Sequence, residues 1–199
     1  MVGLFTLLYF AGMVVQVILR TPYERQRRRV RKPDRRVTIS ERIVLAGLTA
    51  GMFLLPLIYS VSSWLDFANY RLAPSTTAGA GAVGALLLAA ATWLFWRAHH
   101  DLGANWSPSL EIGAGHTLIT QGIYRTIRHP MYTSMLVWAL AQAMLLQNGI
   151  AGGAGLAAFL LLYVLRVPRE ERMMRDHFGD DYSAYSARTG RILPRLRRW

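Results

Sequence analysis

Long stretches with almost no charge constrain the fold of this chain more than any other feature of its sequence. A helix of about 20 apolar residues spans the hydrocarbon core of a bilayer, and several stretches approach that length. Arg166 is the single charged residue in them. The sequence therefore predicts an all-α integral membrane protein with about five transmembrane helices. The stretches are residues 2–19, 43–61, 78–96, 131–146 and 150–167.

The positive charge of the chain lies between and after these stretches. The net charge is +12, and residues 20–42 alone hold ten Arg and Lys residues against three acidic ones. Basic loops of multi-pass membrane proteins stay in the cytoplasm. With five spans, the N-terminus is then outside, and the tail from Pro168 is cytoplasmic. We expect the basic loop to contact anionic lipids, which account for its charge better than a nucleic acid does.

The last two apolar stretches are short and close together. Residues 147–150 read QNGI, and Asn148 followed by glycine is typical of a turn. We expect a helical hairpin over residues 131–167, with both ends on the cytoplasmic side. The chain then divides into N-terminal membrane helices, residues 1–97, and a core, residues 98–199, made of a cytoplasmic connector, the hairpin and a C-terminal segment.

Two kinds of site are not expected. The chain has no cysteine, so disulfides, thiolate nucleophiles and cysteine metal ligands are absent. Its histidines lack the H-E-x-x-H spacing of a helical zinc site, and no metal site is predicted. GAGAVGA, residues 79–85, has the glycine spacing of a dinucleotide-binding loop. It lies in an apolar stretch, however, and favours close packing of membrane helices instead.

Polar residues capable of chemistry concentrate in residues 99–132 and 166–196. Both segments adjoin apolar stretches, so a site between them would face water on one side and lipid on the other. In RHPMY, residues 128–132, Pro130 suits the first turn of a helix. Its polar neighbours suit either a membrane interface or a binding site.

A pair of glutamates, Glu170 and Glu171, follows Pro168 in the second segment. Arg166 and Glu170 are spaced i,i+4, which favours a salt-bridged helix at the interface. A carboxylate pair can also hold an ammonium group, a sulfonium group or ribose hydroxyls. The spacing alone leaves both interpretations open.

The order of three motifs identifies a resemblance. RHPMY at residues 128–132 is followed by EER at residues 170–172 and FGDDYSAY at residues 178–185. Over residues 98–194 the chain resembles the isoprenylcysteine carboxyl methyltransferase family and the related phospholipid methyltransferases. The resemblance implies S-adenosyl-L-methionine as methyl donor, bound in a cytoplasm-facing pocket that the hairpin builds with the C-terminal tail. It also implies a lipophilic, prenyl-like acceptor that enters from the bilayer.

The resemblance also implies which residues hold the cofactor. They belong to the connector, to the start of the hairpin and to the glutamate pair. By position they are His116, Thr117, Leu118, Gly122, Tyr124, His129, Pro130, Tyr132, Glu170 and Glu171.

A carboxylate acceptor would need little further chemistry. It is ionised near neutral pH and needs no general base. Its charge diminishes as it combines with a sulfonium, which a water-poor site favours. What remains is positioning, for which arginine is suited. We expect one arginine of the tail to orient the carboxylate, while Arg128 shares this role or supports the cofactor site. The expected catalytic residues are Arg128, Arg169, Arg172 and Glu171, with Arg166 as a further candidate.

Other functions are compatible with the same residues. An amine acceptor would arrive protonated and need a base such as His129, Glu170 or Glu171. A thiol acceptor would need its thiolate stabilised. Some members with this C-terminal pattern are sterol reductases that use NADPH, so reduction of a lipid double bond is an alternative. A membrane scaffold whose basic loop gathers anionic lipids is the non-enzymatic alternative.

Overall fold

Helices make up most of the computed structural model, which describes residues 2–27, 34–35, 38–107, 110–112 and 115–195. Much of the basic loop, residues 28–33 and 36–37, lies outside these ranges, and so does the expected contact of that part with anionic lipids. The helices are α1 (Val2–Arg27), α2 (Ile39–Thr49), α3 (Leu55–Val61), α4 (Pro74–Leu102), α5 (Pro130–Leu146) and α6 (Gly149–Arg188), with a π-helical turn η1 (Ala50–Leu54) and the 3-10 turns η2 (Asp66–Ala68), η3 (Gly103–Asn105) and η4 (Gly122–Arg125).

Several helices are long and apolar enough to cross a bilayer. Among the described residues there are four such segments: Gly3–Gln26, Ile39–Val61, Pro74–Leu102 and Gly149–Arg188. The second is continuous because η1 joins α2 to α3. α5 is apolar too, but it has 17 residues, fewer than the roughly 20 that span the hydrocarbon core. An integral multi-pass membrane protein is supported, and the number of five spans stays a prediction.

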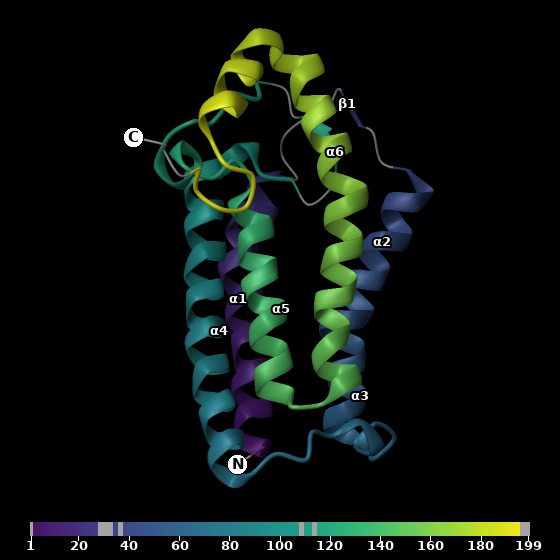
Figure 1. The fold of residues 1–199 in the computed structure, drawn as a ribbon. Helices are drawn as coiled ribbons and strands as arrows, with labels where there is room; N and C mark the ends of the chain where they lie inside the picture. The colour runs from purple at the N-terminus through teal and green to yellow at the C-terminus, as the bar shows by residue number, and fades with distance from the viewer. Residues whose placement is uncertain (1, 28–33, 36–37, 108–109, 113–114, 196–199) are drawn as a thin grey trace.

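The long helices run side by side as a bundle (Figure 1). α4 packs against α5 and α1, while α6 packs against α5 and against the segment formed by α2, η1 and α3. The N-terminus lies at one end of the bundle and the C-terminal tail at the other (Figure 1). Since α4 runs through residue 97, the boundary expected between residues 97 and 98 falls inside a helix. The division into two regions stays a prediction.

Two residues connect α5 to α6. Gln147 has a φ of 52°, in the left-handed region. Asn148 caps α6, because its side-chain oxygen accepts from the backbone N–H groups of Ile150 and Ala151 at 3.0 and 2.8 Å. A short polar side chain at this position satisfies amides that the first helical turn leaves without partners. The start of α5 and the later part of α6 therefore meet at the opposite end of the bundle.

A polar cluster inside the bundle fixes η1 against α5 and α6. The Gln142 amide donates to the carbonyl oxygens of Gly51 and Ala151 at 2.8 and 2.6 Å. The Tyr9 hydroxyl lies between the Met52 carbonyl and the Gln142 amide oxygen. Polar groups in an apolar interior are costly unless they are hydrogen-bonded, and these contacts pair them. The cluster thereby holds the α2 segment in place against α5 and α6.

The tail after α6 returns to the start of α5. α6 is interrupted at Gly179, whose φ of 54° lies in the left-handed region that favours glycine. The chain bends there and folds back toward the bundle (Figure 1). The backbone N–H groups of Arg128 and His129 then donate to the carbonyl oxygens of Gly190 and Arg191, both at 2.9 Å. These bonds join the residues before α5 to a segment 62 positions further along the chain.

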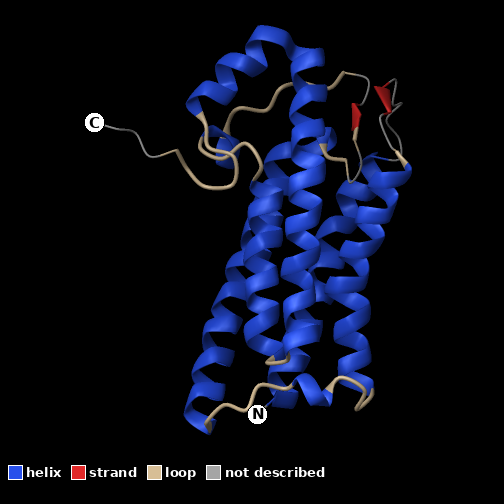
Figure 2. Cartoon of the chain, turned by 45° about the vertical axis from the view of Figure 1, so that its right-hand side comes forward, coloured by secondary structure: helices blue, strands red, loops and turns tan. Residues whose placement is uncertain are grey.

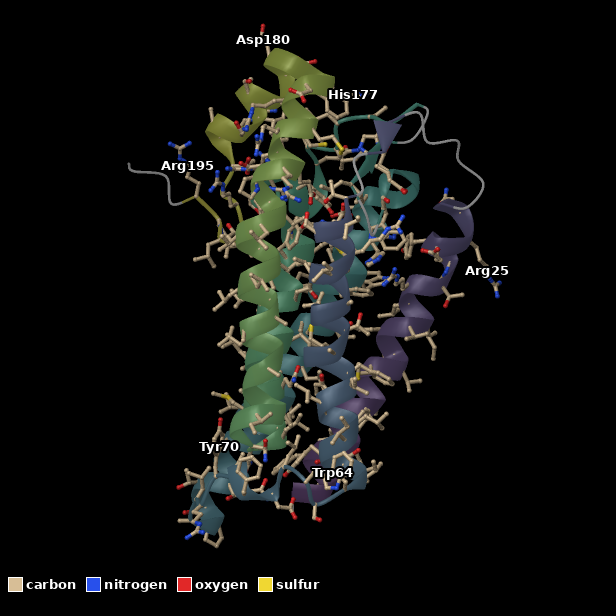
Figure 3. All side chains as sticks on the ribbon, turned by 90° about the vertical axis from the view of Figure 1, so that its right-hand side faces the viewer. Arg25, Trp64, Tyr70, His177, Asp180 and Arg195 are labelled. Carbon is tan, nitrogen blue, oxygen red and sulfur yellow. The ribbon has the colours of Figure 1, made fainter. Side chains whose placement is uncertain are left out.

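The two ends of the bundle differ in character. At the end that holds the tail, the short strands β1 (Asp34–Arg35) and β2 (Glu111–Ile112) pair antiparallel (Figure 2). Arg195 and Asp180 lie at the same end, and Trp64 lies at the opposite one (Figure 3). A charged end and an end with exposed aromatic side chains are typical of membrane proteins. Which end faces the cytoplasm stays a prediction.

Candidate active site

A cavity of about 390 Å³ lies where α2, α4, α5 and α6 meet the segment between α4 and α5. This volume is within the range of small-molecule sites. Eight of the ten residues expected to hold a cofactor line it. They are His116, Thr117, Leu118, Tyr124, His129, Pro130, Tyr132 and Glu170.

Two of the residues expected to hold the cofactor, Gly122 and Glu171, are not among the described residues that line the cavity. Gly122 has a φ of 60°, and a Cβ atom there would lie 2.1 Å from Asp101 Oδ2. The same Asp101 oxygen accepts the backbone N–H of Ile123 at 2.7 Å. Glycine is therefore required by the turn, which fastens the connecting segment to the end of α4.

Pro130 starts α5, because a proline at the first helical position loses no hydrogen bond that the helix needs. His129 and Arg128 precede the helix, and their backbone is held by the tail. Their side chains contact α6. This local geometry turns a short polar motif into one wall of the site.

Glu171 is a buried carboxylate surrounded by positively charged side chains. Its Oε1 accepts from Arg128 Nε at 2.8 Å and lies 3.2 Å from His129 Nε2. Arg191 Nη2 donates to Oε2 at 2.9 Å. Arg128 Nη1 also donates to the Thr189 carbonyl at 2.7 Å. A buried charge is tolerated when it is paired, so this cluster joins α5, α6 and the tail into one unit.

Of the glutamate pair on α6, Glu170 is the member that lines the cavity. The Tyr132 hydroxyl donates to its Oε2 at 2.6 Å. His129 Nδ1 lies 3.7 Å from Oε1, and Arg166 Nε lies 3.8 Å from Oε2. The two glutamates are thus divided by position: Glu171 holds the wall together, and Glu170 presents its carboxylate to the interior.

His129 lies between the two glutamates and is itself buried. Burial opposes a charged ring, but the contacts with Glu170 and Glu171 outweigh it, and the pKa of His129 is raised above its ordinary value. A protonated ring carries an N–H on both nitrogens; here Nε2 lies at hydrogen-bond distance from Glu171 Oε1, and Nδ1 faces Glu170 Oε1 at 3.7 Å. His129 therefore suits the role of a cationic bridge between the carboxylates better than that of a base.

The structure separates the candidate arginines. Arg128 and Arg166 line the cavity. Arg169 and Arg172 are exposed, and they are not among the described residues that line the cavity. Arg169 Nη1 instead donates to Ser40 Oγ at 2.9 Å. The catalytic roles expected for Arg128, Arg169, Arg172 and Glu171 stay predictions, and of the candidate arginines Arg128 and Arg166 line the cavity.

A covering segment, residues 103–119, borders the cavity in its described parts. Thr117 N–H donates to Asn105 Oδ1 at 3.0 Å, and Asn105 Nδ2 donates to Thr117 Oγ1 at 3.3 Å, which closes the segment into a loop. Trp106 is buried against the cavity, and the Arg20 guanidinium lies 4.9 Å from its ring centre. Burial, with a smaller effect of His177, lowers the pKa of His116. The segment thus presents the aromatic rings of Trp106 and His116 to the cavity, together with the carboxylate residue Glu111.

Sequence reasoning missed the contribution of α2. Leu45, Leu48 and Thr49 line the cavity, and Glu41 is a buried carboxylate beside Arg166. Thr38 and Glu41 match the capping-box spacing that marks a helix start. That signal predicts the start of α2 but carries no information about the cavity.

The model of the isoprenylcysteine carboxyl methyltransferase (ICMT) family matches residues 82–176. A protein of Oryza sativa subsp. indica named "Probable protein-S-isoprenylcysteine O-methyltransferase" is 35% identical over 79 residues, which are 40% of this chain and 41% of the relative. The protein-S-isoprenylcysteine O-methyltransferase of Homo sapiens is 26% identical over 142 residues, which are 69% of this chain and 50% of the relative.

A solved structure of the eukaryotic intramembrane Ras methyltransferase ICMT is 20% identical, with a TM-score of 0.46, over 80% of this chain and 54% of that chain. The chain spans half or less of the length of the two curated relatives above. The fold and the site define a helical membrane protein with a partly charged pocket at one end of its bundle. The resemblance found in the sequence is confirmed: residues 82–176 match the model of the isoprenylcysteine carboxyl methyltransferase family.

Proposed function

We propose that this protein transfers a methyl group from S-adenosyl-L-methionine to the carboxylate of a lipophilic, isoprenylcysteine-like acceptor at the boundary between membrane and cytoplasm. The observation that carries the proposal is that charged and apolar side chains line one continuous cavity. The names of the matched relatives, protein-S-isoprenylcysteine O-methyltransferases, support the same reaction.

The two parts of the cavity match the two parts of such an acceptor. Arg166 and Glu170 are among its charged lining residues, and Leu48, Met135 and Leu162 are among its apolar ones. A prenyl-like chain gains free energy by leaving water for apolar surroundings. Its carboxylate gains by pairing with a guanidinium. An acceptor with both groups fits a cavity that presents both surfaces.

The methyl donor also fits the residues present. Glu170 offers a carboxylate to the cavity. Among the described residues, the neighbour of its Oε1 is His129 Nδ1, which lies 3.7 Å away and so beyond hydrogen-bond length. Such an oxygen can accept from an ammonium group or from ribose hydroxyls. Trp106 and Tyr185 add aromatic surface for a purine. When bound, S-adenosyl-L-methionine supplies a methyl group activated by its sulfonium.

The charges around the cavity favour a carboxylate acceptor over an amine. Arg166 would attract a carboxylate and repel a protonated amine. An amine would also need a base, and the raised pKa of His129 means that the ring holds its proton more tightly than an ordinary histidine does. A carboxylate needs orientation only, which Arg166 can provide, while Arg128 keeps the cavity wall in place through Glu171.

We further place the cavity end of the bundle in the cytoplasm and the N-terminus outside. Residues 20–42 hold ten basic residues, and Arg191 and Arg195 add charge in the tail. Positive segments of this kind stay on the cytoplasmic side. Anionic lipids of that leaflet would then neutralise residues 20–42 and hold this end of the bundle at the membrane surface.

Calorimetric titration of the detergent-purified chain with S-adenosylhomocysteine tests the proposal, with NADPH as parallel titrant. We expect micromolar binding of S-adenosylhomocysteine and about tenfold weaker binding in Glu170→Gln, which corresponds to about 1.4 kcal/mol. Asp180→Asn is the matched control, because Asp180 is an exposed acid at the same end of the bundle (Figure 3).

Transfer of a labelled methyl group then identifies the acceptor class. S-farnesylcysteine, phosphatidylethanolamine and a small thiol represent the carboxylate, the amine and the thiol. We expect transfer to S-farnesylcysteine and none to its carboxamide. Binding of NADPH alone would replace the proposal by a reductase, and binding of neither compound would leave the scaffold as the remaining function.

A further inference from the structure

Glu41 is a buried carboxylate in a part of the chain that the family match does not reach. It lies in the first turn of α2, whereas the family model matches residues 82–176. The backbone N–H of Glu41 donates to the capping Thr38 Oγ1 at 3.2 Å, so its place on the helix is fixed. A buried carboxylate is costly unless its surroundings compensate it.

The Glu41 carboxylate connects three segments around the cavity. Its Oε1 accepts the backbone N–H of Leu110, in the covering segment, at 3.1 Å. The same oxygen lies 3.7 Å from Arg166 Nη1, on α6. Oε2 has no hydrogen-bond partner among the described residues. Glu41 therefore stabilises the covering segment and attracts the guanidinium of Arg166 at the same time.

Arg166 has carboxylates near its guanidinium, but among the described residues it makes no hydrogen bond. It is buried and lines the cavity. Its two carboxylate neighbours, Glu41 at 3.7 Å and Glu170 at 3.8 Å, both lie beyond hydrogen-bond length. Within the described part of the chain, its Nε has no hydrogen-bond partner. Arg128, in contrast, donates at 2.8 and 2.7 Å to Glu171 and Thr189.

An arginine in this state can receive an anion from the cavity. Guanidinium donors in a fork match the two oxygens of a carboxylate. The flanking glutamates fix the direction of the side chain and lower the cost of burying its charge, while its buried Nε has no hydrogen-bond partner among the described residues. A guanidinium that is already positioned spends less conformational entropy when the anion binds.

We propose that Glu41 is a positioning residue for the acceptor: it holds Arg166 so that the guanidinium pairs with the acceptor carboxylate. The inference rests on the proposed methyl transfer and adds α2 to the residues that carry it. Leu45 and Leu48 of the same helix line the apolar part of the cavity. One helix then contacts both the lipophilic chain and the arginine that binds the charged end.

Glu41→Gln separates charge from structure, because a glutamine carbonyl still accepts the Leu110 N–H. We expect the KM for S-farnesylcysteine to rise about tenfold, equivalent to about 1.4 kcal/mol. The affinity for S-adenosylhomocysteine should change less than about twofold, since Arg166 and not the donor site is disturbed. Ser40→Ala is the matched control: it alters the adjacent residue of α2, which contacts Arg169 and not Arg166, and should leave both constants unchanged.

A double-mutant cycle with Arg166→Lys tests whether Glu41 acts through Arg166. Lysine keeps the charge but lacks the fork, so Glu41→Gln should have little further effect on KM in that background. An equal rise of KM in both backgrounds would show a merely structural role and overturn the proposal. Glu41→Asp, which keeps the charge, should recover part of the lost affinity, and an Asp variant no better than the Gln variant would also contradict it.

The failure of this inference is distinguishable from that of the proposed function. A wild-type chain that neither binds S-adenosylhomocysteine nor methylates S-farnesylcysteine would overturn the proposed function, and the inference with it. A wild-type chain that does both, with an unchanged KM in folded Glu41→Gln, would overturn the role of Glu41 alone. The thermal unfolding midpoint of each variant in detergent shows that it is folded.

Discussion

Arg128 Nε donates to Glu171 Oε1 at 2.8 Å, between two side chains that are 11% and 4% exposed and 43 positions apart. Proline fixes the start of α5, so the polar residues before it stay outside the helix and face α6. The same bend exposes backbone N–H groups to the tail, which pairs with them. A polar motif directly before an apolar helix is thus explained by what it contacts: a buried carboxylate on the neighbouring helix.

Replacing Glu171 by glutamine should destabilise the folded chain. The change leaves Arg128 and His129 buried without their shared anion, and breaking a buried pair costs about 3–5 kcal/mol. Arg191 is 53% exposed and adds little, because solvent screens its contribution. We expect a loss of about 3 kcal/mol, measured by denaturant unfolding in detergent. Asp180→Asn should unfold like the wild type, and an unchanged midpoint for Glu171→Gln would contradict the structural role of this carboxylate.

Stability should fall as the pH rises, through His129. The pKa of its ring is raised in the folded chain, because Glu170 and Glu171 more than offset burial. The folded state therefore binds the proton more tightly than the unfolded chain, in which histidine titrates near about pH 6.5. The stabilisation is fully present below that pH and is lost as the pH rises through the folded pKa.

Unfolding midpoints between about pH 6 and about pH 9 measure this effect, since the range covers the unfolded pKa and the values above it. His129→Gln should lack the alkaline decline that the wild type shows. His177→Gln, at an exposed position near the same end of the bundle (Figure 3), should retain it. If His129→Gln kept the slope of the wild type, a different group would be responsible.

The catalytic efficiency should depend on Arg166 and not on Arg172. Arg166 lines the cavity, whereas Arg172 is exposed and is not among the described residues that line it. We expect Arg166→Ala to lower kcat/KM for S-farnesylcysteine about 100-fold, or about 2.7 kcal/mol of transition-state stabilisation, and Arg172→Ala to stay within about twofold of wild type. Equal losses in the two variants would show that both act through the total positive charge at this end of the bundle.

Part of this site was predictable from the sequence, because short-range rules determine it. Apolar stretches fold as helices in a membrane, and Pro130 starts a helix for a local steric reason. The i,i+4 spacing of Arg166 and Glu170 places both on one face of α6. That spacing was the available signal that Arg166, and not Arg169 or Arg172, reaches the cavity with Glu170.

The rest of the site depends on contacts between segments that are distant in the sequence. Glu170 and Glu171 are adjacent on a helix and point in different directions, so the sequence shows that they diverge but not which one faces the cavity. The packing of α6 against α5 decides it. Glu41 reaches the cavity because the α2 segment packs against α6, and nothing in its own neighbourhood indicates this. Such pairings follow from the complete fold.

Leu48 should limit the length of the prenyl chain that the cavity accepts. This side chain lines the apolar part of the cavity on α2, so Leu48→Trp would fill space that a long prenyl chain occupies. We expect KM for S-farnesylcysteine to rise about tenfold, equivalent to about 1.4 kcal/mol, while a cysteine with a shorter prenyl chain loses less. Binding of S-adenosylhomocysteine should persist.

Ile43→Trp is the matched control, since Ile43 is 66% exposed on the same helix. Methyl-transfer rates measured against chain length for both variants decide the point, because a uniform loss for all chain lengths would mean that Leu48 supports the fold instead of selecting the acceptor.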